Sequence, residues 1–155
     1  MRTIAIVILF ASLAAGCAYN YEPPDIVGTP LAGAIPGASK DAIFDAASKT
    51  LIAGGHLIGA TDRTAGVIST RMRQFRLTER DVDCGTALGL PYIKDKRTIT
   101  SVGFGIVVSE GRIEITTSLE GEYLKGHVSQ SIALTCVSKG GIERRLFEQI
   151  RAAAL

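Results

Sequence analysis

Residues 98–119 read TITSVGFGIVVSEGRIEITTSL. Every second side chain from Thr98 to Val108, and again from Ile113 to Leu119, is apolar or threonine, which is the spacing of a strand that buries one face. Ser-Glu-Gly at positions 109–111 separates the two runs, so the stretch predicts an antiparallel hairpin. The apolar face of such a hairpin has to be covered by other elements of the chain.

Three further strands are predicted on either side of this hairpin. Residues 56–60 and 67–75 form a second hairpin around the turn at residues 62–66, and residues 128–137 form a fifth strand. Residues 77–96 show no clear period and contain glycine and proline, so they predict an irregular excursion between the two hairpins.

Helices are predicted at both ends of this region. Residues 40–53 follow the N-cap candidate Ser39 and stop at Gly54-Gly55, and residues 142–154 follow Gly140-Gly141 and place their large apolar side chains on one stripe. The order is α-β-β-β-β-β-α. We therefore expect an α+β fold, a two-layer sandwich in which an antiparallel sheet of about five strands is covered by an N-terminal and a C-terminal helix.

The N-terminal segment has the order of an export signal. Arg2 precedes an apolar run at residues 4–11, and small residues lead to Cys17. A transmembrane helix is one competing interpretation, but the 12 residues from Ile4 to Ala15 are fewer than the roughly 20 that cross a bilayer. An ordinary signal peptide, cut at a nearby Ala-x-Ala-like site, is another.

Leu13-Ala14-Ala15-Gly16-Cys17 resembles a bacterial lipobox. The resemblance implies a thioether-linked diacylglycerol on Cys17 and an acylated new N-terminus, and two or more acyl chains suffice to hold a protein on a membrane. Ala18 stands where an Asp commonly retains lipoproteins in the inner membrane. In a Gram-negative host we therefore expect the cell envelope as location, on the periplasmic face of the outer membrane.

Three parts of the chain are predicted. Residues 1–16 form a lipoprotein signal peptide, residues 17–38 form the lipidated cysteine and a Pro/Gly-rich tether, and residues 39–155 form a single α+β periplasmic domain. An alternative is that the segment after Cys17 docks on the domain through its larger side chains, Tyr19, Tyr21, Ile26 and Val27.

The charge of the chain is close to balanced. Removal of residues 1–16 takes Arg2 from the 17 basic side chains and leaves 16 against 15 acidic ones. Nucleic-acid binding needs a clustered excess of Lys and Arg, so we expect no nucleic-acid partner. The 139 residues that remain are enough for one hydrophobic core.

Two cysteines remain once Cys17 is assigned to the lipid. In an oxidising compartment, Cys84 and Cys136 are expected to form a disulfide that closes a loop of about 50 residues. A competing interpretation joins both to His56 and His127 as a zinc site, although the closely spaced ligand pairs of such sites are missing.

Catalytic signatures are absent from the sequence. It contains no Gly-x-Ser-x-Gly, His-Glu-x-x-His, Gly-rich phosphate loop or Cys-x-x-Cys. The histidines are expected to be structural, and the carboxylate pairs Asp81/Asp83 and Glu120/Glu122 to lie in solvated links rather than to perform acid/base chemistry or bind calcium. The Ser138–Gly141 segment suggests an anion-binding helix start, but capping explains it as well.

One region resembles a known family. Residues 52–58, IAGGHLI, and residues 62–70, DRTAGVIST, are similar to the helix-hairpin start of the helix-grip domains in NlpB (BamC-like) lipoproteins of the outer-membrane barrel-assembly machinery. The resemblance covers about 25 residues and implies a small helix-and-sheet envelope module. This chain departs from the family in having one folded domain rather than two.

The expected function is that of a non-enzymatic, membrane-anchored lipoprotein. The combination of an anchor with missing catalytic motifs favours a protein-interaction or assembly module with an envelope protein as partner. A binding module for a small apolar or cell-wall ligand is the alternative. We expect no enzymatic activity, cofactor or metal.

Overall fold

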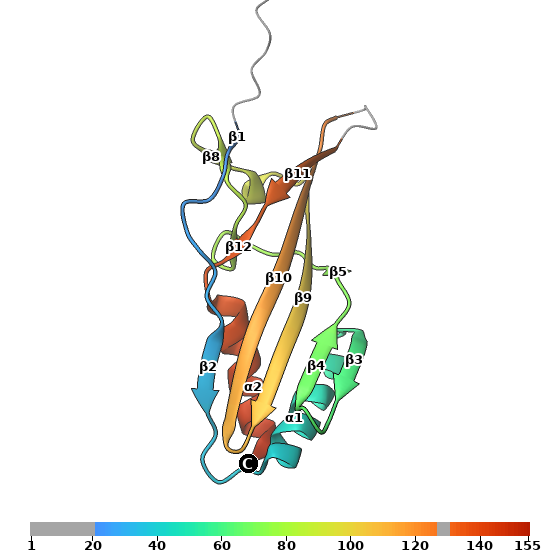
Figure 1. Cartoon of the computed structure of the whole chain (residues 1–155). Coiled ribbons are helices and arrows are strands. Elements are labelled where there is room, and N and C mark those ends of the chain that lie inside the picture. Colours follow the sequence, from blue (N-terminus) through green and yellow to red (C-terminus); the bar gives the residue numbers. More distant parts are fainter. Residues whose placement is uncertain (1–20, 127–130) are drawn as a thin grey trace, which may run out of the picture.

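A long hairpin, β9 (Thr98–Ser109) and β10 (Arg112–Leu124), runs the length of the molecule in the computed structural model, which describes residues 21–126 and 131–155 (Figure 1). The two strands stay in register from Ser109 opposite Arg112 to Thr98 opposite Tyr123. Gly111 adopts a positive φ of 61° in the tight turn between them, a conformation that costs glycine little. The predicted hairpin is therefore present, and its second strand is longer than predicted.

Seven strands form the main sheet. Its order is β11-β10-β9-β4-β3, with β2 also paired to β10 and β5 also paired to β9, and all of these pairings are antiparallel. The predicted count of about five was too low, because a strand from the N-terminal segment joins the sheet and the predicted strand at 67–75 is broken into two. The bounds are β2 (Leu31–Ala34), β3 (Ile58–Asp62), β4 (Val67–Thr70), β5 (Arg73–Gln74) and β11 (Ser131–Thr135).

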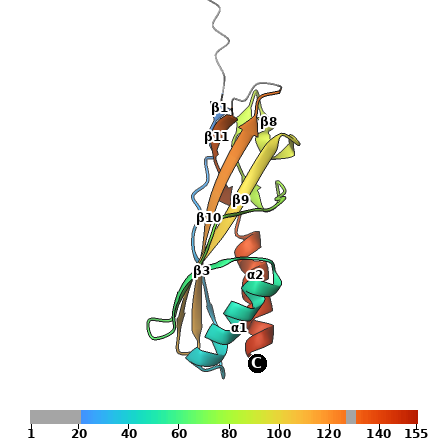
Figure 2. The same cartoon turned by 90° about the vertical axis from the view of Figure 1, so that its right-hand side faces the viewer.

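Two helices pack side by side on one face of this sheet, α1 (Lys40–Ala53) and α2 (Gly141–Ala154) (Figure 2). The Ser39 side chain caps α1 by accepting a hydrogen bond from the Ala42 N–H at 3.2 Å. Between the helices and the sheet lie fully buried aliphatic side chains from all of these elements, which form the core: Ile43, Leu51, Ile68, Ile106, Ile115 and Ile150.

The N-terminal segment is part of the fold from residue 21 onward, which corrects the tether predicted at 17–38. β1 (Tyr21–Glu22) pairs with β7 (Thr86–Ala87), β2 pairs with β10, and Ile35 is completely buried. Gly33 makes this docking possible, because a Cβ at this position would collide with the ring of Phe147. The prolines and glycines of this segment interrupt any alternation of apolar and polar residues, so the sequence does not predict a strand here. The strand forms because it pairs with β10.

The predicted irregular excursion contains short elements that cover the other half of the hairpin. β7 (Thr86–Ala87) lies between β1 and β8 (Leu90–Pro91), and the 3₁₀ helix η1 (Tyr92–Lys94) follows. β6 (Val82–Asp83) pairs with β12 (Val137–Ser138). A disulfide between Cys84 and Cys136 joins the excursion to the segment after β11, as the cysteine count favours.

The architecture is therefore a mixed α+β fold with antiparallel sheets and two helices. Within residues 21–126 and 131–155, no helix has both the length and the apolar character needed to cross a membrane. Cys17 and His127 lie outside the described residues.

Candidate functional site

Asp81 and Asp83 are used for structure. The Asp81 carboxylate is 8% exposed, and it accepts hydrogen bonds from the Thr78 hydroxyl at 2.7 Å and from the Arg145 guanidinium at 2.6 Å. Burial alone would raise the pKa of Asp81, but the hydrogen bonds from Arg145 and Thr78 outweigh burial and hold the pKa below its ordinary value. Asp83 accepts from the Gly85 N–H at 2.9 Å, so the pair fixes the excursion.

A buried carboxylate of the chain lies in the first turn of α2. The Ser138 hydroxyl accepts from the Gly140 N–H at 3.1 Å and donates to the Glu143 carboxylate at 2.7 Å. Glu143 is 2% exposed and lies in the first helical turn, where a negative charge is favoured by the helix dipole. Hydrogen bonds within the chain therefore occupy Ser138 and Glu143, although the N-cap residue Gly140 supplies no side-chain cap to α2.

His56 lies in an aromatic setting that suits a neutral ring. Its imidazole is 4.6 Å from the Phe75 ring and 4.9 Å from the Phe104 ring, measured between centroids. Burial, and secondarily the positive charge of Arg73, lower the pKa of His56. The cysteines of the alternative zinc site are joined to each other and so cannot act as thiolate ligands, and within the described residues no group of three or more His, Cys, Asp or Glu is arranged to hold a metal ion.

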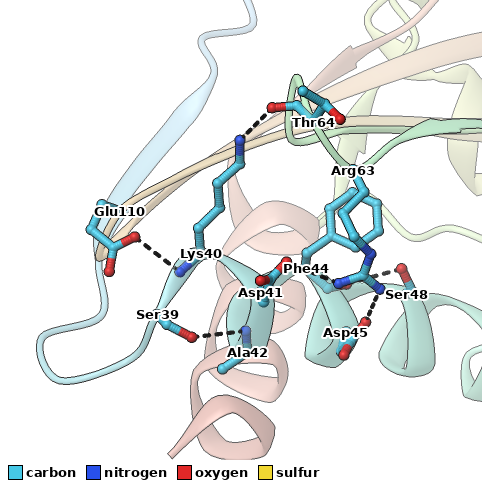
Figure 3. Close-up of polar contacts among 10 residues, drawn as sticks. All are labelled: Ser39, Lys40, Asp41, Ala42, Phe44, Asp45, Ser48, Arg63, Thr64 and Glu110. Carbon is cyan, nitrogen blue, oxygen red and sulfur yellow. Dashed lines mark hydrogen bonds and ion pairs between the residues drawn. The ribbon is translucent and has the colours of Figure 1, made fainter.

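A polar network ties α1 to the turn between β3 and β4 (Figure 3). The Lys40 ammonium donates to the Thr64 carbonyl at 2.6 Å, and Arg63 pairs with Asp41 at 3.1 Å and with Asp45. Arg63 is neutralised by the two aspartates, and Lys40 bonds to a backbone carbonyl, so the network holds α1 against this turn.

Glu120 and Glu122 lie on β10 and not in a polar link, which corrects that expectation. β10 continues through both residues to Leu124. Gly121 between them is buried, and the absence of a Cβ there leaves room for the sulfur of Cys136 against the strand. The register places Glu120 opposite Ser101 and Glu122 opposite Ile99, on the face of the sheet that α1 and α2 do not cover. Neither carboxylate forms an ion pair with another described residue.

Small side chains make up most of this uncovered face. The outward positions nearest the two glutamates carry glycine, serine and threonine, whereas Val107, Arg112 and Glu114 occupy the outward positions nearer the turn of the hairpin. Next to the glutamates a hollow of about 450 Å³ opens between β10, β9 and β11. We call this region the outer sheet face, and it consists of Ser101, Gly105, Thr116, Ser118, Glu120 and Glu122. Gly103 lies in the same row but is buried beneath the Met72 side chain.

The outer sheet face offers shape and charge but no reactive constellation. Most of its side chains are short, and its two carboxylates give one part of it a negative charge. Such a surface can bind a protein segment or face through backbone and side-chain contacts, whereas an enzyme site is usually concave with titratable groups of strongly shifted pKa.

Comparisons with known proteins give little beyond this geometry. No family model matches the chain, and no curated protein matches it. Two solved structures with 14% identity are similar to it. A DUF4468 family protein from Bacteroides ovatus has a TM-score of 0.48 over 72% of this chain and 64% of that one, so the chain spans less than two thirds of its length. A TBP-like protein from Parabacteroides distasonis has a TM-score of 0.47 over 81% of this chain and 90% of that one.

The outer sheet face is also visible in the sequence, although it contains no catalytic motif. The solvent-facing positions of a half-buried hairpin usually carry long charged side chains, yet residues 101, 103, 105, 116 and 118 are Ser, Gly, Gly, Thr and Ser. The alternating pattern of the hairpin is therefore enough to reveal an outward row of small residues across two neighbouring strands.

Proposed function

We propose that this chain is a non-enzymatic lipoprotein of a bacterial cell envelope, anchored by lipid on Cys17, and that it binds another envelope protein through the outer sheet face. The proposed anchor rests on the likeness of residues 13–17 to a lipobox. With Ala18 after the cysteine, the outer membrane, facing the periplasm, is the proposed location. A role in assembly, as in the NlpB (BamC-like) lipoproteins, is the corresponding interpretation of residues 52–70.

The uncovered sheet face is the observation that carries the protein-binding part of the proposal. The domain can be regarded as two layers, with the helices and the excursion on one side of the hairpin and no described helix or strand packed on the other. Glu120 and Glu122 have no ionic partner there among the described residues, so a partner with basic side chains would gain charge-assisted contacts. Electrostatic complementarity of this kind sets the specificity of an interface.

Photo-crosslinking in the native membrane tests this surface directly. A benzophenone amino acid at Ser118, on the outer sheet face, is expected to give one reproducible adduct, whereas the same probe at Gln149, exposed on α2, is expected to give none. Glu122→Lys should weaken the adduct at Ser118, and Glu148→Lys, an equal change of charge at an exposed position on α2, should not. The proposal fails if both probe positions give the same products or if both charge changes act alike.

A further inference from the structure

The hairpin between β7 and β8 lies beside β1 at one end of the molecule (Figure 1). Leu88 is 82% exposed and Leu90 is 73% exposed. Leu124, at the end of β10, is 40% exposed, and its N–H is bound to the Arg97 carbonyl at the same end. We call residues 87–91 the β7–β8 tip.

The backbone of the β7–β8 tip holds Leu88 outward in a conformation that leucine rarely adopts. Ala87 pairs with Leu90, so Leu88 and Gly89 form a two-residue turn, and their φ angles are +50° and +75°. Turns with positive φ at both central positions favour Asn-Gly strongly, since a branched side chain is strained there. Leucine in place of asparagine gains nothing for the fold, because its side chain packs against little of the protein.

The covalent distance from Cys17 to the tip is short. Tyr21 is fixed beside the tip, because it pairs with Ala87 and its hydroxyl accepts from the Thr135 N–H at 2.9 Å. Cys17 precedes Tyr21 by four residues, which span at most about 14 Å when fully extended. A lipid on Cys17 therefore holds this end of the domain, and no other, against the bilayer surface.

The residues beneath the tip have the chemistry of a membrane interface. A cleft of about 520 Å³ lies between the tip and the rings of Tyr92 and Tyr123. The Arg97 guanidinium lies 4.8 Å from the centre of the Tyr123 ring and 2.6 Å from the Asp95 carboxylate. Of the two rings, Tyr92 is buried and Tyr123 is partly exposed. A tyrosine ring with one apolar and one polar end is favoured at the level of lipid headgroups, and the neutralised arginine adds little charge.

We propose that the β7–β8 tip inserts into the surface of the bilayer beside the lipid anchor and orients the domain on the membrane. This inference rests on the proposed lipidation of Cys17. Leu88, Leu90 and Leu124 enter the boundary between headgroups and acyl chains, where burial of their exposed apolar surface is favourable. The anchor then supplies attachment, and the tip fixes which end of the domain faces the lipid.

Tryptophan fluorescence can test the insertion, because the chain contains no tryptophan. The lipidated protein carrying Leu90→Trp is reconstituted into vesicles of phosphatidylethanolamine and phosphatidylglycerol, with Ile52→Trp, an exposed position on α1, as the matched control. Insertion predicts that the Leu90→Trp emission shifts to shorter wavelength and is quenched by lipids brominated on their acyl chains. The Ile52→Trp emission is expected to do neither.

A second variant separates insertion from folding. Leu88→Asn restores the residue that this turn favours, so the thermal midpoint should stay the same or rise, while bromolipid quenching of Leu90→Trp should fall severalfold. A blue shift without bromolipid quenching would mean that a protein or a second copy covers the tip, and an unshifted, unquenched signal would mean that nothing does. Either result overturns the inference. The mass of the purified protein reports lipid on Cys17 separately, so failure of the proposed anchor is distinguishable from failure of insertion.

Discussion

Removal of the disulfide should destabilise the domain by an amount that follows from its position in the chain. Cys84 and Cys136 are separated by 52 residues, and the loop-closure entropy of a loop of this size corresponds to about 4 kcal/mol of unfolding free energy. The β6–β12 pairing and the contact between Arg145 and Asp81 still join the two regions without the disulfide. The native structure is therefore expected to persist in Cys84→Ala/Cys136→Ala, with most of the loss arising in the unfolded state.

Urea unfolding followed by circular dichroism, in a soluble Cys17→Ser background, measures this loss. We expect the unfolding free energy of the double alanine variant to fall by about 4 kcal/mol, or the thermal midpoint by roughly 10 °C. Addition of reductant to the parent protein is the matched control, because it opens the loop without deleting any side chain. A loss below about 1 kcal/mol in both experiments would refute the loop-closure reasoning.

Other predictions concern single contacts. Gly33→Val should lower the unfolding free energy by about 1–3 kcal/mol, because its side chain meets the Phe147 ring, and Phe147→Ala in the same chain should lessen the penalty in a double-mutant cycle. The pKa of His56 is lower in the fold than in the unfolded chain, so on acidification the unfolded chain binds the proton first. The unfolding free energy should therefore fall as pH drops below about 6.5 and level off below the folded pKa. This slope should be missing in His56→Phe. Asp81→Asn should lower the unfolding free energy by about 1–2 kcal/mol at neutral pH, measured by urea unfolding. The difference in unfolding free energy between parent and variant should shrink as pH falls below the ordinary aspartate pKa and the native carboxylate is protonated. A difference that does not change with pH would exclude the pairing with Arg145 as its source.

Elements formed by local interactions were predicted more accurately from the sequence than elements formed by contacts with distant parts of the chain. α1 was predicted at 40–53 and spans Lys40–Ala53, since a cap, a local stripe and two glycines define it. The 98–119 hairpin has a period of two and a turn of its own, so it too is set locally. β2 is different, because its Leu-Ala-Gly-Ala sequence becomes a strand only by pairing with β10, far along the chain.

The candidate sites show the same division. The pairing of Cys84 with Cys136 could be anticipated because the number of cysteines restricts the choice. The environment of Glu120 and Glu122 could not, because their placement depends on Gly121 letting a sulfur from a distant segment lie against the strand. The small residues at positions 101, 103, 105, 116 and 118 could be identified from the sequence. The absence of a described helix or strand over them could not, because it depends on how the rest of the chain packs.

The antiparallel pairing of β2 with β10 also determines how the domain responds to mechanical load. A pull on the chain at Tyr21 acts along the axis of β2, so the hydrogen bonds between Leu31–Ala34 and Arg112–Ile115 are loaded together in shear and cannot open one at a time. The same load passes from β2 into the longest strand of the sheet. A pull on the N-terminal end is thus resisted by several backbone hydrogen bonds at once rather than by one after another.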